Sequence, residues 1–241
     1  MRQNRVTLRL GEEVSGVEPF QDEKGERVRI TLASGKQIVT EKALYSIGRT
    51  GATEKLNVSA AGLPPDERGR IKVNAQYQTA VPHIYAVGDV IGFPSLASTS
   101  MEQGRLAACH AFGVEARSVP ELFPYGIYTI PEISTVGRNE EELTDLGVPY
   151  EVGKAHYREI ARGQIIGDST GLLKLIFHLD TRQLLGVHII GEGASELVHI
   201  GQAVIAFGGK IDYFVQTVFN YPTLAECYKT AAFDGINRLG L

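Results

Sequence analysis

One stretch, residues 83–105, constrains this 241-residue chain more than any other; its sequence is HIYAVGDVIGFPSLASTSMEQGR. The apolar run at residues 84–87 predicts a short strand, which stops where Asp89 follows Gly88. A loop with glycine and proline comes next, and a helix is expected to begin near Ser98. In open α/β sheets, ligands bind where the carboxyl end of a strand faces a helix N-terminus. This stretch is therefore the first candidate binding site.

The residue types at this junction suit a ligand that is rich in oxygen. The carboxylate of Asp89 can accept hydrogen bonds from sugar-like hydroxyl groups. The unpaired N–H groups in the first turn of the helix favour an electron-rich oxygen. The same pattern also has a purely structural interpretation, in which Asp89 ends a strand and the neighbouring serines and threonine cap a helix. The pattern alone leaves both interpretations open.

The composition excludes several classes of protein. With 43% hydrophobic and 22% charged residues and a net charge of −4, the chain suits one or two globular domains with a substantial core. The mildly acidic balance predicts neither nucleic-acid binding nor binding to a membrane surface, and no apolar run approaches the ~20 residues of a membrane span. The six histidines show no metal-ligand spacing, so no metal site is expected. Cys109 and Cys227 form no CxxC pair, which predicts the absence of a redox dithiol and favours a reducing, cytoplasmic location.

Residues 83–105 resemble the second flavin-binding motif of the FAD-dependent pyridine nucleotide-disulfide oxidoreductases. The resemblance implies that the cofactors are FAD and NAD(P). It implies that Asp89, after Gly88, holds the ribityl chain. It also implies that backbone groups at the start of the helix meet the pyrimidine part of the flavin ring. Those groups belong to Ser95, Leu96, Ala97 and Ser98.

The first fifty residues resemble the final β-meander of the NAD(P)-binding domain of that family. Alternating apolar residues predict half-buried strands at residues 6–10 and 28–32, residues 37–40 follow a turn, and residues 43–47 predict a more fully buried strand. The glycine-rich βαβ units that bind NAD(P) and FAD in the family are missing. The chain is therefore expected to be the C-terminal half of a longer protein.

Two further contacts with cofactor follow from this resemblance. Val14 is expected to touch the adenine end of NAD(P). Gly48, at the crossover from the NAD(P) domain to the FAD domain, would let a cofactor approach the backbone closely because it lacks a Cβ. Gly48 also fits an ordinary turn at the end of a strand.

The pattern changes after a linker at residues 118–120. Predicted strands at residues 126–130, 148–157, 172–178 and 184–190 are joined by turns, and helices are expected after Asn139 and over residues 194–207 and 223–239. Helices segregated from a mainly antiparallel sheet make an α+β domain, which resembles the dimerisation domain of the same family. The predicted fold class is thus α/β followed by α+β. The predicted domains are a remnant of the NAD(P)-binding domain at 1–49, the C-terminal part of the FAD domain at 50–118, and a dimerisation domain at 119–241.

A second motif lies at residues 220–226, with the sequence NYPTLAE, and resembles the family signature His-Pro-Thr-x-x-Glu. In the disulfide reductases that histidine is the acid/base for thiol chemistry and the glutamate orients it. Here Tyr221 stands at the histidine position, and a phenol is a poor proton shuttle near neutral pH. Tyr221 and Glu226 are the candidate catalytic residues. Alternatively, Thr223 and Glu226 form a capping box at the start of a helix.

NYPTLAE together with the later AAFDGINRL resembles the transhydrogenases of the family, which pass hydride between NADPH and NAD+ through FAD alone. The partners that this implies are nicotinamide nucleotides and a second copy of the chain, in a homodimer or a larger assembly. A disulfide oxidoreductase similar to dihydrolipoamide dehydrogenase or mercuric reductase is the main alternative. A non-catalytic dimerisation fragment is the other.

Overall fold

The computed structural model describes residues 5–116 and 122–240. The chain divides into two compact units, Met1–Thr50 and Gly51–Leu241, which are described separately below. The predicted boundary between residues 118 and 119 lies outside the described residues. Within the described ranges, no helix is long and apolar enough to cross a membrane.

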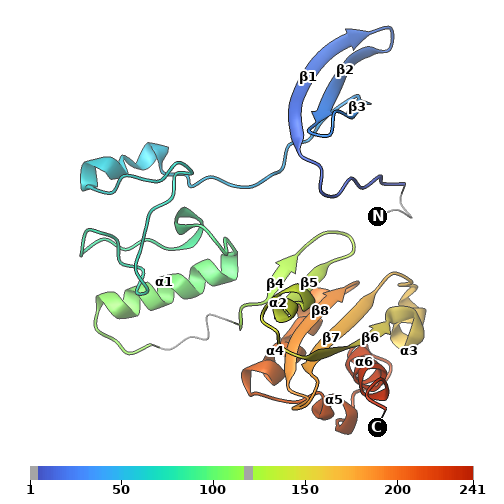
Figure 1. The fold of residues 1–241 in the computed structure, drawn as a ribbon. Coiled ribbons are helices and arrows are strands. Elements are labelled where there is room, and N and C mark those ends of the chain that lie inside the picture. Colours follow the sequence, from blue (N-terminus) through green and yellow to red (C-terminus); the bar gives the residue numbers. More distant parts are fainter. Residues whose placement is uncertain (1–4, 117–121, 241) are drawn as a thin grey trace. The chain divides into compact units, whose positions relative to one another are not determined.

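The first unit is a three-stranded antiparallel sheet with the order β1-β2-β3 (Figure 1). Its strands are β1 (Val14–Asp22), β2 (Gly25–Leu32) and β3 (Gln37–Thr40). The meander predicted at residues 28–32 and 37–40 is therefore confirmed.

Two predicted strands of this unit are wrong. Residues 6–10 are irregular, and the first strand begins at Val14 instead. Residues 43–47 are irregular too, with Leu44, Tyr45 and Ile47 exposed. An apolar run becomes a strand only beside a neighbour that completes its hydrogen-bond ladder. No segment among the described residues of this unit pairs with either run.

Residues 51–116 contain short 3-10 turns and one long helix, α1 (Ala97–Ala111). The turns are η2 (Glu54–Leu56), η3 (Val58–Ala61) and η4 (Gly88–Ile91). The helix predicted near Ser98 is confirmed, but the strand predicted at residues 84–87 is wrong. That run makes only an isolated bridge, from Tyr85 to Gln78, because the chain turns into η4 directly after it.

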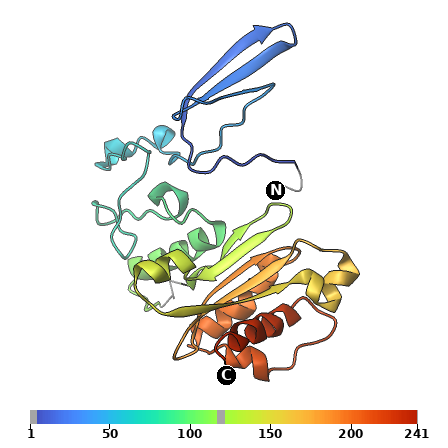
Figure 2. The same ribbon diagram turned by 45° about the vertical axis from the view of Figure 1, so that its right-hand side comes forward.

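Residues 122–240 form a five-stranded antiparallel sheet in the order β4-β5-β8-β7-β6 (Figures 1 and 2). The strands are β4 (Tyr125–Ile127), β5 (Ile133–Gly137), β6 (Tyr150–His156), β7 (Leu172–His178) and β8 (Leu184–Ile190). The helices are α2 (Glu140–Asp145), α3 (Ala161–Ile166), α4 (Ala194–Ala206), α5 (Asp212–Gln216) and α6 (Glu226–Asn237). The predicted α+β class with a mainly antiparallel sheet is confirmed.

Helices α4 and α6 cover one face of this sheet, and the smaller α2 covers part of the other (Figure 2). Alternate residues of β7 serve the two faces, as strand geometry requires. Leu173, Leu175 and Phe177 are fully buried under α4 and α6, whereas Ile176 packs with Leu143 of α2.

Tyr228 of α6 joins the two covering helices. Its hydroxyl donates a hydrogen bond to the carbonyl oxygen of Leu197 at 2.7 Å and accepts one from the N–H of Gly201 at 3.1 Å. In an undisturbed helix those two groups of α4 bond each other. The tyrosine oxygen therefore sits inside the hydrogen-bond ladder of α4 and ties α4 to α6.

The backbones of α6 and β6 touch directly. A Cβ on Gly153 of β6 would overlap the carbonyl oxygen of Ala231, and a Cβ on Gly235 would lie 2.6 Å from the Phe177 ring. Asp234 of α6 accepts the N–H of Lys154 at 2.9 Å across the same contact. The helix lies this close because neither glycine carries a side chain.

The outer edge of β6 is closed by carboxylates. The N–H groups of alternate residues point away from β7 and are each bonded to an acid: Val152 to Glu151 at 2.9 Å, Lys154 to Asp234 at 2.9 Å and His156 to Glu159 at 2.8 Å. Free N–H groups on an edge strand are a template for pairing with another chain. Here negative side chains occupy them instead.

Gly153→Ala tests the contact between α6 and β6. We expect it to lower the free energy of unfolding by about 2–3 kcal/mol, because the added methyl group must displace a helix backbone. Urea unfolding followed by circular dichroism measures the change. Gly104→Ala in α1 is the control: apart from its chain neighbours and the backbone of its own helix, no described heavy atom lies within 4 Å of its Cβ position, so it should be neutral or slightly stabilising. An equal effect of the two variants would contradict the close contact.

Candidate functional site

The turn η4 places Asp89 at the surface, directly after the buried residue Gly88. Gly88 is buried and has φ +75°, a left-handed conformation that favours glycine. A Cβ at this position would lie 3.0 Å from the hydroxyl of Ser100 in α1. The N–H of Gly88 donates to the side-chain oxygen of Gln103 at 2.7 Å. Asp89 itself is exposed.

The N-terminus of α1 has no side-chain cap among the described residues. The hydroxyl of Ser95 donates to the carbonyl oxygen of Gly92 at 2.8 Å, and Leu96 occupies the N-cap position in an extended conformation. No side chain in the described part of the chain caps α1, and its first turn contains no acid. Ala97 and Ser98 are exposed. The purely structural interpretation is wrong in both details, since residues 84–87 form no strand and no serine or threonine side chain caps the helix. The same missing strand also removes the strand end on which the binding-site prediction was based.

A carboxylate and uncapped helix N–H groups therefore lie within one short segment. Such a site can accept hydrogen bonds from hydroxyl groups and donate them to carbonyl oxygens. The hydroxyl of Thr99 is also buried and has no hydrogen-bond partner among the residues that the structure describes. These groups fit a neutral, oxygen-rich ligand better than a phosphate, because Asp89 adds negative charge.

Val14 and Gly48 both belong to the first unit. Val14 opens β1 and is exposed. Gly48 has φ +137°, and apart from its two chain neighbours no described residue has an atom within 4 Å of the position of its missing Cβ. The contacts of Val14 and Gly48 with a cofactor stay predictions.

The second motif differs from the capping-box interpretation. Helix α6 begins at Glu226 with Ala225 at the N-cap, and Thr223 lies outside the helix, where its hydroxyl donates to the carbonyl oxygen of Asn220 at 2.7 Å. The capping box is therefore wrong, because the chain makes a turn before the helix starts. Tyr221 is 73% exposed. One carboxylate oxygen of Glu226 is buried and has no partner among the described residues.

The sequence analysis missed a set of loop anchors around Tyr157. Glu132 accepts both the hydroxyl of Ser195, at 2.6 Å, and its N–H, at 3.1 Å, and these bonds lower the pKa of Glu132. Asp168 accepts the N–H groups of Gly171 and Glu192. The run Asp-Ser-Thr-Gly at residues 168–171 was the available signal, since an aspartate commonly bonds the backbone two or three residues on. These anchors hold loops rather than a ligand.

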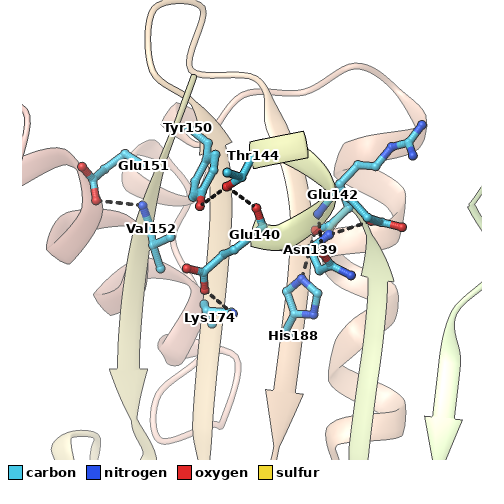
Figure 3. Close-up of polar contacts among 10 residues, drawn as sticks. Asn139, Glu140, Glu142, Thr144, Tyr150, Glu151, Val152, Lys174 and His188 are labelled. Atoms are coloured by element: carbon cyan, nitrogen blue, oxygen red, sulfur yellow. Dashed lines mark hydrogen bonds and ion pairs between the residues drawn. The ribbon is translucent and has the colours of Figure 1, made fainter. Parts of the chain in front are cut away.

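A second polar cluster lies on the outer face of the sheet (Figure 3). Lys174 bonds Glu140 of α2, which lowers the pKa of Glu140. His188, the cross-strand partner of Lys174, contacts the carbonyl oxygen of Arg138 through Nε2 at 3.0 Å. A carbonyl only accepts, so Nε2 carries the proton, and burial lowers the pKa of His188. Asn139 and Glu142 form the capping box of α2.

This second cluster holds α2 on the sheet. Its bonds link α2 to the sheet, as in the contact of Thr144 with Tyr150 of β6 at 3.1 Å (Figure 3). Over residues 5–116 and 122–240, no group of three or more potential ligands is placed to hold a metal ion. Asp89 with the first turn of α1 is therefore the better candidate for a binding site.

Two family models match this chain, one in its N-terminal part and one in its C-terminal part. Residues 123–232 match the pyridine nucleotide-disulphide oxidoreductase dimerisation domain, and residues 1–104 match pyridine nucleotide-disulphide oxidoreductase. The soluble pyridine nucleotide transhydrogenase of Mycobacterium tuberculosis (strain ATCC 25177 / H37Ra) is 56% identical over 99% of this chain and 50% of its own length. That of Pectobacterium atrosepticum is 51% identical over 98% of this chain and 50% of its own.

The chain thus spans about half the length of the curated relatives it matches. Among solved structures, the HOCl-induced flavoprotein disulfide reductase RclA from Escherichia coli matches 96% of this chain and 52% of its own, with a TM-score of 0.83 and 24% identity. At that identity the likeness shows a shared fold.

His188 makes the stability of the fold depend on pH. Because burial lowers its pKa in the folded state, the neutral form stabilises the fold above the unfolded value of about 6.5, and that contribution is lost as pH falls below it. We expect the free energy of unfolding to decrease between about pH 7.5 and pH 5, with a shallower decrease in His188→Gln, whose amide still donates to Arg138. Urea titrations at each pH measure both.

His83→Gln is the control for this measurement, because His83 is exposed. It should keep the pH dependence of the parent protein. Parallel curves for the parent and His188→Gln would show that His188 does not contribute to the acid sensitivity.

Proposed function

Because the chain belongs to the pyridine nucleotide-disulphide oxidoreductase family, we propose that it forms the C-terminal half of an enzyme that transfers hydride between NADPH and NAD+ with the help of FAD. The observation that carries the proposal is the identity of 56% and 51% to proteins named as soluble pyridine nucleotide transhydrogenases, over nearly the whole chain. The activity belongs to the longer protein, since the matched relatives are about twice as long.

In this proposal the segment from Gly88 to Ser98 holds the flavin. FAD, when bound, supplies the chemistry by accepting and returning hydride. Asp89 accepts hydrogen bonds from the hydroxyl groups of the ribityl chain. The uncapped backbone N–H groups at the start of α1 donate to oxygen atoms of the ring, and Ser95 and Leu96 shape the approach to that helix. The exposed Asp89, Ala97 and Ser98 support this assignment.

The nicotinamide nucleotides are assigned to the first unit and the rest of the enzyme. Val14 would contact the adenine end, and Gly48 would leave room for a cofactor beside the backbone. The left-handed φ of Gly48 and the open space where its Cβ is missing support this role.

Tyr221 has a packing role in the proposal. Transfer of hydride in and hydride out needs no proton shuttle at this position. The exposed ring of Tyr221 would cover the flavin of a second copy and exclude water from it. Glu226 would support this contact, because its buried, unpartnered oxygen is available to a group from outside the described chain.

A second copy of the chain is part of the same proposal. Residues 123–232 match a dimerisation domain, and large apolar side chains within that region lie exposed, among them Ile130, Val218 and Phe207. We propose a homodimer, or a larger assembly built from it, that covers such side chains. A cytoplasmic location completes the proposal, because Cys109 and Cys227 are both free thiols.

Steady-state transfer from NADPH to an NAD+ analogue, with the full-length protein and no dithiol present, tests the function. Turnover that depends on bound FAD supports the proposal. The disulfide reductase alternative predicts the opposite pattern, with reduction of a disulfide substrate and negligible transfer between nucleotides. If the full-length protein shows neither reaction, the chain acts as a dimerisation module.

Asp89→Ala should weaken FAD binding in the full-length protein roughly ten- to a hundredfold, because a lost hydrogen bond to a charged group costs ~1.5–3 kcal/mol. Flavin fluorescence during dialysis against buffer measures the retained cofactor. Asp89→Asn keeps an oxygen acceptor and should lie between the parent and the alanine variant. Full retention of FAD in Asp89→Ala would show that Asp89 has no role in holding it.

Tyr221→Phe should keep transhydrogenase turnover within about threefold of the parent, under 1 kcal/mol of barrier, because the ring and its packing remain. Tyr221→Ala should do more damage, since it opens the surface that the ring covers. Both rates are normalised to flavin content. A hundredfold loss in the phenylalanine variant would mean that the hydroxyl takes part in the chemistry.

A further inference from the structure

We infer that Gln103 is a positioning residue for the flavin site, which it serves by fixing the turn that carries Asp89. The inference rests on the proposed role of Asp89. Gln103 lies within α1, and its side chain bonds the backbone of Gly88 rather than the carboxylate of Asp89. Its effect on a ligand would therefore be indirect.

The contact itself is short and buried. The side-chain oxygen of Gln103 accepts the N–H of Gly88 at 2.7 Å, and only 7% of the Gln103 surface is exposed. A buried N–H without an acceptor is costly, so the turn strongly favours the conformation that keeps this bond. Val87, at the N-cap of η4, provides no side-chain bond in the described structure.

Two backbone bonds hold the other end of η4. The N–H of Gly92 donates to the carbonyl oxygen of Asp89 at 3.1 Å, and the N–H of Ile71 donates to that of Val90 at 2.8 Å. Both hold the later residues of the turn. The bond to Gln103 holds the residue just before Asp89, and so sets the direction in which the carboxylate leaves the backbone.

Helix α1 therefore controls both halves of the proposed site. Its first turn carries the uncapped N–H groups and Ser100, which lies next to Gly88. Its second turn carries Gln103. The hydroxyl of Ser100 also donates to the carbonyl oxygen of Leu96 at 2.9 Å, at the N-cap of the same helix. The carboxylate of Asp89 and the N–H donors are thus set relative to each other by one rigid element.

Hydrogen exchange at Gly88 in this chain is the first test. Gln103→Met keeps the length of the side chain but removes the acceptor, and we expect the Gly88 amide to exchange at least about tenfold faster. Gln103→Glu retains an oxygen at the same position and should exchange within about threefold of the parent rate. Unchanged exchange in Gln103→Met would overturn the inference.

FAD affinity of the full-length protein is the second test. Gln103→Met should weaken binding by about three- to tenfold, less than Asp89→Ala, and Gln103→Glu should restore most of it. If Asp89→Ala weakens FAD binding and Gln103→Met does not, the inference fails while the proposed function stands. If Asp89→Ala has no effect, the proposed flavin site fails and the inference fails with it.

Gly88→Ala tests the same turn from the other side, should Gln103→Met not fold. The added methyl group would meet Ser100 at 3.0 Å in a left-handed backbone conformation. We expect weakened FAD binding with the circular dichroism spectrum preserved. Parental FAD affinity in this variant would overturn the inference.

Discussion

The part of the chain from residue 122 to 240 depends on close approach of backbones at glycine positions. The backbone of Gly201 in α4 lies against the side chain of Val187 in the sheet, and Gly153 of β6 lies against the backbone of Ala231 in α6. The ring of Tyr228 is fully buried against α4, and its hydroxyl bonds the carbonyl oxygen of Leu197 and the N–H of Gly201. Core packing of this density leaves little freedom to slide one helix past another. The sheet and its two large helices therefore behave as one block.

The candidate flavin site is built differently. Its chemical groups stand on the 3-10 turn η4, on the irregular residues 92–96 and on the first turn of α1. One long helix, α1, supplies order to that segment through Gln103, Ser100 and its own first turn. The polar groups of a site on a loop are held in position by the rigid element against which the loop packs.

Local patterns predicted much of this fold. β7 and β8 have the predicted bounds, α4 ends one residue early, and the Asn139 cap is present as a full capping box. Strand formation at residues 6–10, 43–47 and 84–87 could not be settled locally, because a strand also needs a neighbour. The bond from Gly88 to Gln103 joins residues 15 apart in sequence, and no local rule indicates it. The sequence did not indicate the unpartnered oxygen of Glu226 either. The capping motif predicted that Glu226 bonds the backbone of Thr223, but the turn before α6 leaves Thr223 outside the helix.

The acids along the outer edge of β6 also bear on how copies of this chain can assemble. A sheet grows without limit when each added strand presents fresh main-chain donors to the next. At this edge the donors are already engaged by Glu151, Asp234 and Glu159, and the opposite edge strand, β4, spans only Tyr125–Ile127. This sheet therefore offers little main-chain edge for pairing with a second copy, whereas side-chain surfaces related by a rotation axis close into a finite oligomer. The same three carboxylates that complete one strand thus favour a countable assembly over a fibre.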